Sequence, residues 1–263
     1  RINKILSSIN LSVSKIYDAD YQNDLLLIED FGNDIFSKKL NSSNEKNLYE
    51  KAIHLLSTIH NHSDLKVQNL KKYNFEILLH ESELFIEWYL EKHLKLNLNN
   101  SEKNEFQNIL EKHFNSLTLK QNNLVLRDFH VDNLIYLNDR DGIHQLGLID
   151  YQDALIGSSV YDFVSLIEDV RHPIKNDLKN SLVEMYSKLI SVDQNELKRE
   201  ISFYSIQRNL KIIGIFSRLK YRDDKKNYFS MIEVAWSFIT SHLKNNEYKD
   251  LSNWMNNIMN NSL

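Results

Sequence analysis

Cysteine is absent from this chain of 263 residues, and glycine and proline are scarce, with five and one respectively. Without cysteine there is no disulfide and no cysteine-ligated zinc, and the composition is compatible with a reducing cytoplasm. Hairpins and tight turns depend on glycine and proline, so their scarcity favours a mostly helical protein over a β-rich one.

Excess positive charge and long apolar runs are also lacking. The formal net charge is −4, so there is no electrostatic basis for binding nucleic acid. No apolar run approaches the roughly 20 residues of a membrane-spanning helix, and no signal-peptide pattern is visible. We therefore expect a cytoplasmic protein with neither nucleic acid nor membrane as a partner.

Several common catalytic signatures are missing as well. The chain has no glycine-rich turn ending in Lys-Ser or Lys-Thr, as a P-loop requires, and no dinucleotide-binding glycine fingerprint. The HESE stretch at 80–83 lacks the second histidine of a His-Glu-x-x-His zinc motif. His60 and His62 are two apart on a predicted helix and point to different faces, so we assign them to the surface or to a helix cap.

Hydrophobic patterns predict a few strands within a largely helical chain. Apolar residues at helical spacing predict helices at 2–9, 45–62, 75–96 (bent near 80–83), 102–117, 160–171, 176–190, 194–220 and 225–244. Short apolar runs predict strands within 11–20, at 25–28, within 123–129, and at 134–137 and 146–149, the last two joined by a tight turn at Asp141-Gly142. This order indicates an α+β protein.

One constellation of acids and amides follows these strands. In LVLRDFHVDN, at 124–133, an apolar run ends in Arg127 and Asp128, and Asn133 completes an Asp-x-x-x-x-Asn pattern; Asp150 ends the later run LGLID. Phosphoryl transfer from ATP requires a base beside the acceptor hydroxyl and side-chain oxygens that hold Mg²⁺ on the phosphates. The pattern provides such groups. The alternative is that these residues only cap helices and form turns.

The sequence around these residues resembles that of a known superfamily. LVLRDFHVDNLIYL at 124–137 and GLIDYQDALIGSSVYDFVSLIEDVR at 147–171 resemble the aminoglycoside phosphotransferase and choline kinase superfamily, relatives of protein kinases. ELFIEWYL at 83–90 and QRNLKIIGIFSRL at 207–219 resemble its branch of anomeric N-acetylmuramate/N-acetylglucosamine kinases. The resemblance implies a protein-kinase-like, two-lobed α+β fold with a mostly helical large lobe.

The resemblance also implies roles for the constellation. Asp128 would be the catalytic base that orients and deprotonates the acceptor hydroxyl, and Asn133 and Asp150 would be Mg²⁺ ligands. Arg127 would lie beside the base, either stabilising charge or holding the loop. ATP and Mg²⁺ are the cofactors implied.

Three further residues near the loop receive roles in the same way. His130 resembles a superfamily histidine for which we favour loop scaffolding over chemistry. Asp162 resembles a buried aspartate that braces the catalytic loop from a helix start; the alternative is an ordinary acid in a first helical turn. Asp153 would help to position substrate or cap a turn.

LLLIEDFG at 25–32 resembles the strand and hinge that hold adenine, with the Glu29 carbonyl and the Phe31 amide as contacts. Residues 1–32 would then be the remainder of the small lobe and the hinge, and residues 33–263 the helical large lobe with the catalytic loop and the metal-binding hairpin. A glycine-rich loop and a strand lysine are missing, since Lys4 falls in a predicted helix. We therefore expect an incomplete small β lobe and a chain truncated at its N-terminus.

The acceptor is less well defined. Asp150-Tyr151-Gln152 replaces Asp-Phe-Gly, and no Ala-Pro-Glu segment follows, which favours a small-molecule kinase over a protein kinase. The later helices are basic, which suits a neutral or acidic sugar better than a polycation. Arg208 would meet a sugar carboxylate. Trp88 would stack on a sugar or pack in the core.

The sequence thus predicts a monomeric phosphotransferase that moves the γ-phosphate of ATP to a sugar hydroxyl, with an N-acetylated amino sugar as the small-molecule substrate. Two alternatives remain open. One is a kinase for another acceptor, such as an aminoglycoside or choline, and the other is a non-catalytic pseudokinase.

Overall fold

The computed structural model describes residues 1–62 and 69–260. The chain forms two compact units, each built from two separate stretches of sequence. The first contains residues 1–72 and 120–197, and the second contains residues 73–119 and 198–263. Within the described residues, no helix has both the length and the apolar character that a membrane crossing requires.

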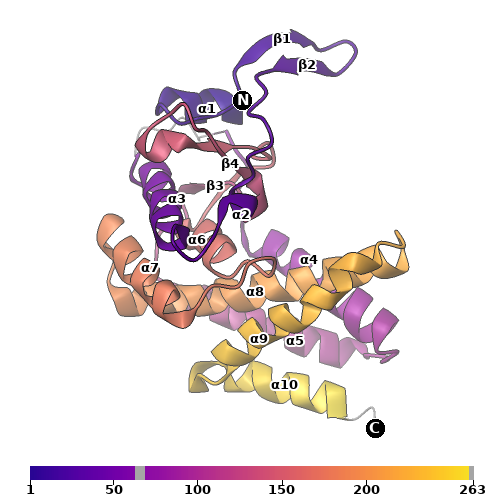
Figure 1. Cartoon of the computed structure of the whole chain (residues 1–263). Helices are drawn as coiled ribbons and strands as arrows, with labels where there is room; N and C mark the ends of the chain where they lie inside the picture. The colour runs from indigo at the N-terminus through magenta and orange to yellow at the C-terminus, as the bar shows by residue number, and fades with distance from the viewer. Residues whose placement is uncertain (63–68, 261–263) are drawn as a thin grey trace. The chain divides into compact units, whose positions relative to one another are not determined.

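The first unit combines five helices with three pairs of short strands among the described residues (Figure 1). Its helices are α1 (Ile2–Ser8), α2 (Phe36–Lys39), α3 (Glu45–Asn61), α6 (Ser159–Ile167) and α7 (Asn176–Leu189). Its strands are β1 (Ile16–Asp20), β2 (Leu25–Ile28), β3 (Asn123–Val125), β4 (Leu134–Tyr136), β5 (Leu146–Leu148) and β6 (Leu155–Gly157). The antiparallel pairs are β1–β2, β3–β6 and β4–β5.

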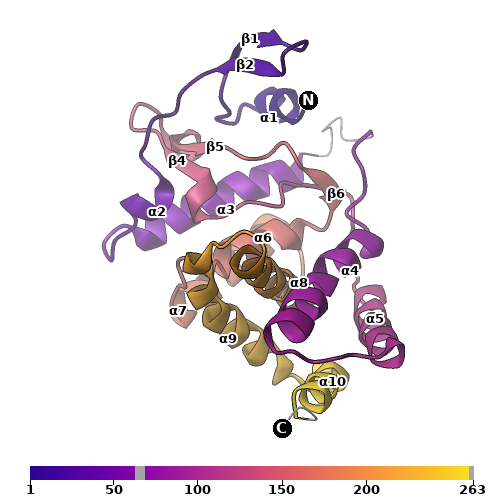
Figure 2. The same cartoon turned by 90° about the vertical axis from the view of Figure 1, so that its right-hand side faces the viewer.

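Helix α3 is the centre of this unit. Its apolar residues recur at helical spacing, and Leu48, Ala52, Leu55, Leu56 and Ile59 are all buried. The helix packs against α6, α7, β3 and β5, and the course of α3 can be followed in Figure 2. Each buried leucine or isoleucine contributes about 1.5–3 kcal/mol, so α3 anchors the strands that follow it in the sequence.

The predicted hairpin of β4 and β5 is confirmed, with Leu134 opposite Leu148 and Tyr136 opposite Leu146. Its connection is longer than a tight turn, because a 3-10 turn at Gly142–Gln145 precedes β5. Strand β6 is not among the predicted strands. It has only three residues, too few to show alternation, and its pairing with β3 depends on a partner far away in sequence.

The second unit is helical. Its elements are α4 (Phe75–Leu84), a π-helix (Phe85–His93), α5 (Asn100–Asn115), most of α8 (Gln194–Tyr221), a 3-10 helix (Lys226–Met231), α9 (Ile232–Leu243), a 3-10 turn (Asn246–Tyr248) and α10 (Lys249–Asn260). Helix α8 begins at the end of the first unit. The predicted helix 75–96, expected to bend near 80–83, changes from α-helix to π-helix just after that point, between Leu84 and Phe85.

Gly214 of α8 lies against this change of helix type. A Cβ atom at Gly214 would lie 2.3 Å from the carbonyl carbon of Leu84 and 2.6 Å from its oxygen. Glycine is therefore required for α8 to approach the backbone of α4 at its last residue.

Helix α10 is not among the predicted helices, because its many asparagines obscure the amphipathic pattern of its apolar residues. Leu251, Trp254, Met255 and Ile258 are buried on one side of it. The Trp254 indole donates to the carbonyl of Glu102 at 2.9 Å, which fixes α10 on α5. The predicted helix 225–244 is also corrected, since its first turns are 3-10.

The surface position predicted for His60 is wrong. Its ring nitrogen Nε2 is fully enclosed although the residue as a whole is half-buried. Nδ1 lies 2.5 Å from the Tyr186 hydroxyl on α7. Burial lowers the pKa of His60 to about 3. His62, by contrast, is exposed at the C-terminal cap of α3, as expected.

Candidate active site

The stretch after β3 is held by a buried carboxylate. Asp162, in the first turn of α6, is fully buried and accepts hydrogen bonds from the Leu126 amide at 2.6 Å and the Arg127 amide at 2.9 Å. These bonds hold Arg127 in the left-handed region, with φ of 73°. This backbone turn ends the β3 segment, so the next residue, Asp128, leaves the core and is exposed.

The loop from Asp128 to Asn133 closes on itself. The Asp128 carbonyl accepts from the His130 amide at 3.1 Å and from Asn133 Nδ2 at 3.0 Å. His130 is buried, and its Nδ1 accepts from the Asp132 amide at 3.3 Å, which caps the 3-10 turn at Val131–Asn133. The loop is therefore a defined structure that presents the Asp128 carboxylate to solvent.

Asn133 and Asp150 meet at one end of the β4–β5 hairpin. Asn133 precedes β4, Asp150 follows β5 by two residues, and the Ile149 amide donates to the Asn133 carbonyl at 3.2 Å. Asn133 Nδ2 lies 3.4 Å from Asp150 Oδ2. Asp150 has a φ of 57°, and its Oδ1 accepts from Gln152 Nε2 at 2.7 Å. The antiparallel pairing thus places the two predicted metal ligands side by side.

The donor atoms at this point fit Mg²⁺. Asn133 uses its amide nitrogen within the loop, so its side-chain oxygen and the exposed Asp150 carboxylate are the oxygen donors on offer. Elsewhere in residues 1–62 and 69–260 there is likewise no group of three or more histidine or acidic side chains arranged around a metal position. Mg²⁺ is commonly held by one or two protein groups, with substrate phosphates and water completing the shell.

A cavity of about 330 Å³ adjoins these ligands. Ile16 and Ile28 from the β1–β2 hairpin and Leu148 from β5 give it apolar walls, and Asp150 also lines it. An apolar cleft with a few polar groups is typical of small-molecule sites. The arrangement suits a nucleotide, with its flat purine ring against the apolar walls and its phosphates near the Asp150 carboxylate.

The predicted hinge follows β2. The Glu29 carboxylate pairs with Arg140 at 2.8 Å and accepts from the Lys15 amide at 3.0 Å. The Phe31 ring packs on Gly147 of β5, where a Cβ would lie 2.7 Å from the ring. In the described part of the chain, no hydrogen bond uses the Glu29 carbonyl or the Phe31 amide. Both main-chain groups are therefore available to a ligand.

Helix α1 also contacts the site. Asn3 Nδ2 donates to the Tyr151 hydroxyl and to the Ser14 carbonyl, each at 2.8 Å. Burial raises the pKa of Tyr151. The Asn3–Tyr151 link is not predicted from the sequence, because no local pattern connects Asn3 with a tyrosine that lies after β5. Asp153 is exposed in the turn before β6.

Two predicted acceptor residues belong to the second unit and are described within it. Trp88 is half-buried in the π-helix. Arg208 on α8 is 5% exposed, and its Nη1 is buried without a hydrogen-bond partner among the described residues. A buried guanidinium nitrogen without a hydrogen-bond partner is costly unless a ligand or water completes it.

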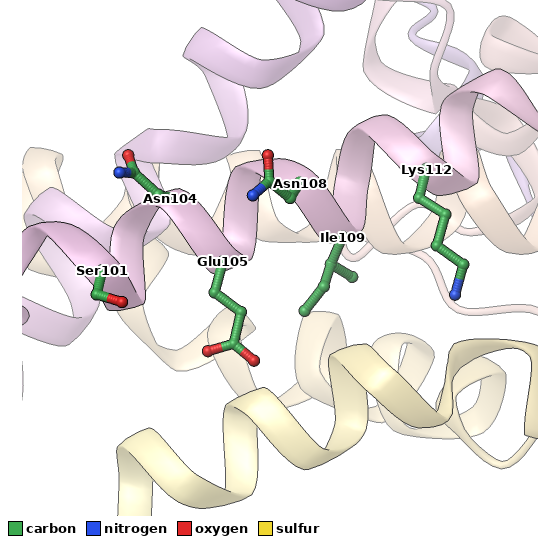
Figure 3. A pocket seen from close by; sticks show the side chains of 6 residues that line it. All are labelled: Ser101, Asn104, Glu105, Asn108, Ile109 and Lys112. Carbon is green, nitrogen blue, oxygen red and sulfur yellow. The ribbon is translucent and has the colours of Figure 1, made fainter.

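A separate hollow of about 650 Å³ lies along α5 in the second unit. Figure 3 shows Ser101, Glu105, Ile109 and Lys112 on the α5 wall, with α10 nearby. Lys112 already pairs with Asp250 of α10 at 2.7 Å. None of the predicted site residues lines this hollow, and we assign it no role.

An exposed aspartate on a structured loop, an Asn–Asp pair on a hairpin and an adjoining apolar cleft are the arrangement expected of a kinase-like phosphotransferase. The chain belongs to the phosphotransferase enzyme family, whose model matches residues 1–198. The resemblance stated from the motifs is thereby confirmed, and so is the expected class of enzyme, a kinase with a hydroxyl acceptor.

Individual relatives match a longer part of the chain than the family model does. The chain is 28% identical to the N-acetylmuramate/N-acetylglucosamine kinase of Pseudomonas putida over 251 residues, covering 90% of this chain and 70% of that protein. It is 30% identical to the kinase of the same name from Neisseria meningitidis over 239 residues, covering 87% of this chain and 69% of that protein.

Solved structures confirm the predicted fold class. A choline kinase from Streptococcus pneumoniae aligns with a TM-score of 0.63 at 19% identity, covering 90% of this chain and 78% of that one. An ADP-bound aminoglycoside phosphotransferase aligns with a TM-score of 0.55 at 16% identity, covering 91% and 79%. At these identities the likeness establishes the fold alone, which is the kinase-like α+β fold.

Proposed function

We propose that the protein transfers the γ-phosphate of ATP to a hydroxyl of N-acetylmuramate or N-acetylglucosamine. The observation that carries this acceptor is the agreement between the curated relatives, which share one name and match 87% to 90% of the chain in the two proteins described above. Choline and aminoglycoside kinases share the fold at lower identity, which favours neither acceptor for this chain.

In the proposed mechanism, Asp128 orients the acceptor hydroxyl toward the γ-phosphate and accepts its proton during transfer. The Asn133 side-chain oxygen and the Asp150 carboxylate would hold Mg²⁺, which neutralises charge on the nucleotide phosphates when bound. Arg127 would keep Asp128 in place or stabilise charge, and His130 and Asp162 would support the loop through the contacts described above.

The nucleotide would use the cavity beside Asp150. The Glu29 carbonyl and the Phe31 amide would read the adenine edge, since neither is used within the described structure. The apolar walls from Ile16, Ile28 and Leu148 would cover the faces of the base. An ADP-bound neighbour with the same fold supports a nucleotide at this kind of site.

On the acceptor side, we assign Arg208 to the carboxylate of N-acetylmuramate. Its buried and unpartnered Nη1 would gain a charge-assisted hydrogen bond from an acidic sugar. Trp88 would provide an aromatic face for the ring, and Asp153 a polar contact near the catalytic end.

A coupled ADP-release assay on the intact gene product tests this function. The panel contains N-acetylmuramate, N-acetylglucosamine, choline and kanamycin, each with Mg-ATP, and Asp128→Ala is the control. We expect turnover on an acetylated amino sugar and a loss of about 10²–10⁴-fold in the variant, the usual contribution of a general base.

The other outcomes are equally informative. Turnover restricted to choline or kanamycin would replace the proposed acceptor. Binding of Mg-ATP with no turnover on the panel would favour the non-catalytic alternative. Activity that survives Asp128→Ala would contradict the assigned base.

A further inference from the structure

A second buried carboxylate, Asp169, contacts the catalytic loop from beyond the other end of α6. Asp169 is fully buried, and its Oδ2 accepts from the Val131 amide at 3.3 Å. Its Oδ1 accepts from the Arg171 amide at 3.0 Å and from Arg171 Nη1 at 3.1 Å. The carboxylate is thus satisfied by three donors, one of which belongs to the loop.

Arg171 carries the connection to the next loop residue. Its Nε lies 3.4 Å from Asp132 Oδ2, and Asp132 Oδ1 accepts from the Ser37 hydroxyl of α2 at 2.5 Å. The Arg171 side chain is 26% exposed, and its guanidinium bridges a buried acid, Asp169, and a half-exposed one, Asp132. Asp132 is therefore held from two sides, by α2 and by the segment after α6.

These contacts lie in the loop between Asp128, the proposed base for phosphate transfer, and Asn133, the proposed metal ligand. Asp162 fixes the backbone just before Asp128, and the Asp169–Arg171 pair fixes Val131 and Asp132, just before Asn133. Asp162 lies in the first turn of α6, a helix of nine residues, and Asp169 follows that helix by two residues, so the loop is attached to α6 at one end and to the segment just after α6 at the other. The spacing between base and metal ligand then depends on both attachments.

We propose that Asp169 and Arg171 are positioning residues that set the placement of Asn133 relative to Asp128. The proposal rests on the proposed function of the loop, and neither residue touches a reacting atom. A shift of about 1 Å in a reacting group can reduce the rate by about 10²-fold. Loss of the pair therefore lowers kcat while the nucleotide cleft keeps its shape.

The neighbouring acid, Glu168, offers a matched control for effects that arise only from a loss of protein stability. Glu168 is also fully buried, and it pairs with Lys179, a cation of α7 that is 19% exposed. This ion pair stands one residue from Asp169 and has the same chemistry. If the role of Arg171 were only to neutralise a buried acid, Lys179→Ala and Arg171→Ala would have the same consequences.

The first measurement is steady-state kinetics on Arg171→Ala, Arg171→Lys, Asp169→Asn and Lys179→Ala with the acceptor that wild type turns over. We expect Arg171→Ala to lower kcat by about 10-fold or more, with KM for ATP within about twofold. Arg171→Lys keeps the charge and recovers part of the loss. Lys179→Ala leaves kcat within about twofold, and an equal loss in Lys179→Ala and Arg171→Ala overturns the proposal.

The second measurement is hydrogen exchange of the peptide spanning residues 126–134, followed by mass spectrometry. We expect faster exchange there in Arg171→Ala and Asp169→Asn than in wild type and Lys179→Ala. This readout needs no turnover, so it decides the proposal even if no acetylated sugar is phosphorylated. Unchanged exchange in Arg171→Ala overturns it.

Discussion

At the scale of single residues, the site depends on two residues whose backbone is held in the left-handed region. Arg127 has a φ of 73° and Asp150 a φ of 57°. This conformation costs non-glycine residues about 1–2 kcal/mol each, and it persists only where surrounding contacts demand it. Here Asp162 holds the Arg127 amide and Gln152 holds the Asp150 carboxylate. Such turns direct Asp128 and Asp150 out of their strands.

The proposed role of Arg208 in acceptor recognition can also be tested at a single residue. If Arg208 binds a sugar carboxylate, Arg208→Ala should raise KM for N-acetylmuramate by about 10-fold or more, since hydrogen bonds to charged groups contribute about 1.5–3 kcal/mol. KM for N-acetylglucosamine, which has no carboxylate, should stay within about twofold. Steady-state kinetics on both sugars measures this directly.

Arg199, on the same helix and far more exposed, supplies the control variant Arg199→Ala. Comparing two acceptors on one enzyme separates recognition from folding, because damage to the fold affects both sugars alike. An equal loss on both sugars would show that Arg208 is a structural residue.

At the scale of elements, the junction of α4 and the π-helix is the least ordinary feature of the second unit. A π-helix of nine residues is long for this rare conformation. It follows the point where α8 presents Gly214 to the Leu84 backbone. Gln207 of α8 also donates to the Leu78 carbonyl at 3.0 Å, so α8 contacts α4 at two levels.

Gly214→Ala should therefore destabilise the protein in spite of alanine's better helix propensity. The added methyl group would overlap the Leu84 backbone, and overpacking of this kind costs about 1–3 kcal/mol or more. Urea unfolding measures the change. Thr240→Ala on the exposed face of α9 should change stability by less than about 1 kcal/mol. A Gly214→Ala midpoint at or above that of wild type would refute the close contact.

At the scale of the whole molecule, the proposed site residues divide between the two units. Asp128, Asn133, Asp150 and the cavity beside Asp150 all belong to the first unit, whereas Trp88 and Arg208 belong to the second. The residues proposed for phosphate transfer therefore all lie in the first unit, and two of the residues proposed for the acceptor, Trp88 and Arg208, lie in the second. The proposed boundary at residue 32 between a small and a large lobe stays a prediction.

Global stability should depend on pH through His60. Its folded-state pKa of about 3 lies below the ordinary 6.5, so between these values the unfolded chain binds the additional proton. The contribution of neutral His60 is fully present above about pH 6.5 and is lost as the pH falls toward 3. From pH 7 to pH 5 this single group should cost about 2 kcal/mol.

Urea unfolding of wild type and His60→Gln at pH 7, 6 and 5 measures the effect. Glutamine does not titrate and can still donate to Tyr186, so the variant should lose less stability across this range. Parallel pH profiles for the two proteins would rule out His60 as the source.

Much of this protein follows from local sequence. The helical spacing in α3, the β4–β5 hairpin and the Asp-x-x-x-x-Asn loop with its later Asp150 are all visible because each is encoded within a few turns or one short strand pair. The motif also led to the family, since its residues lie within one loop and the hairpin that follows it.

Only tertiary structure decided the rest. Strand β6 exists because β3 lies beside it, and α10 is ordered by Trp254 packing on α5. His60 Nε2 is enclosed and its ring contacts α7, a helix distant in sequence, and Asp169 contacts Val131 because the segment after α6 lies against the loop. In each case the stabilising partner is remote in sequence, so no local pattern records it. Burial and long-range hydrogen bonds, which arise only when the chain is folded, give these residues their roles.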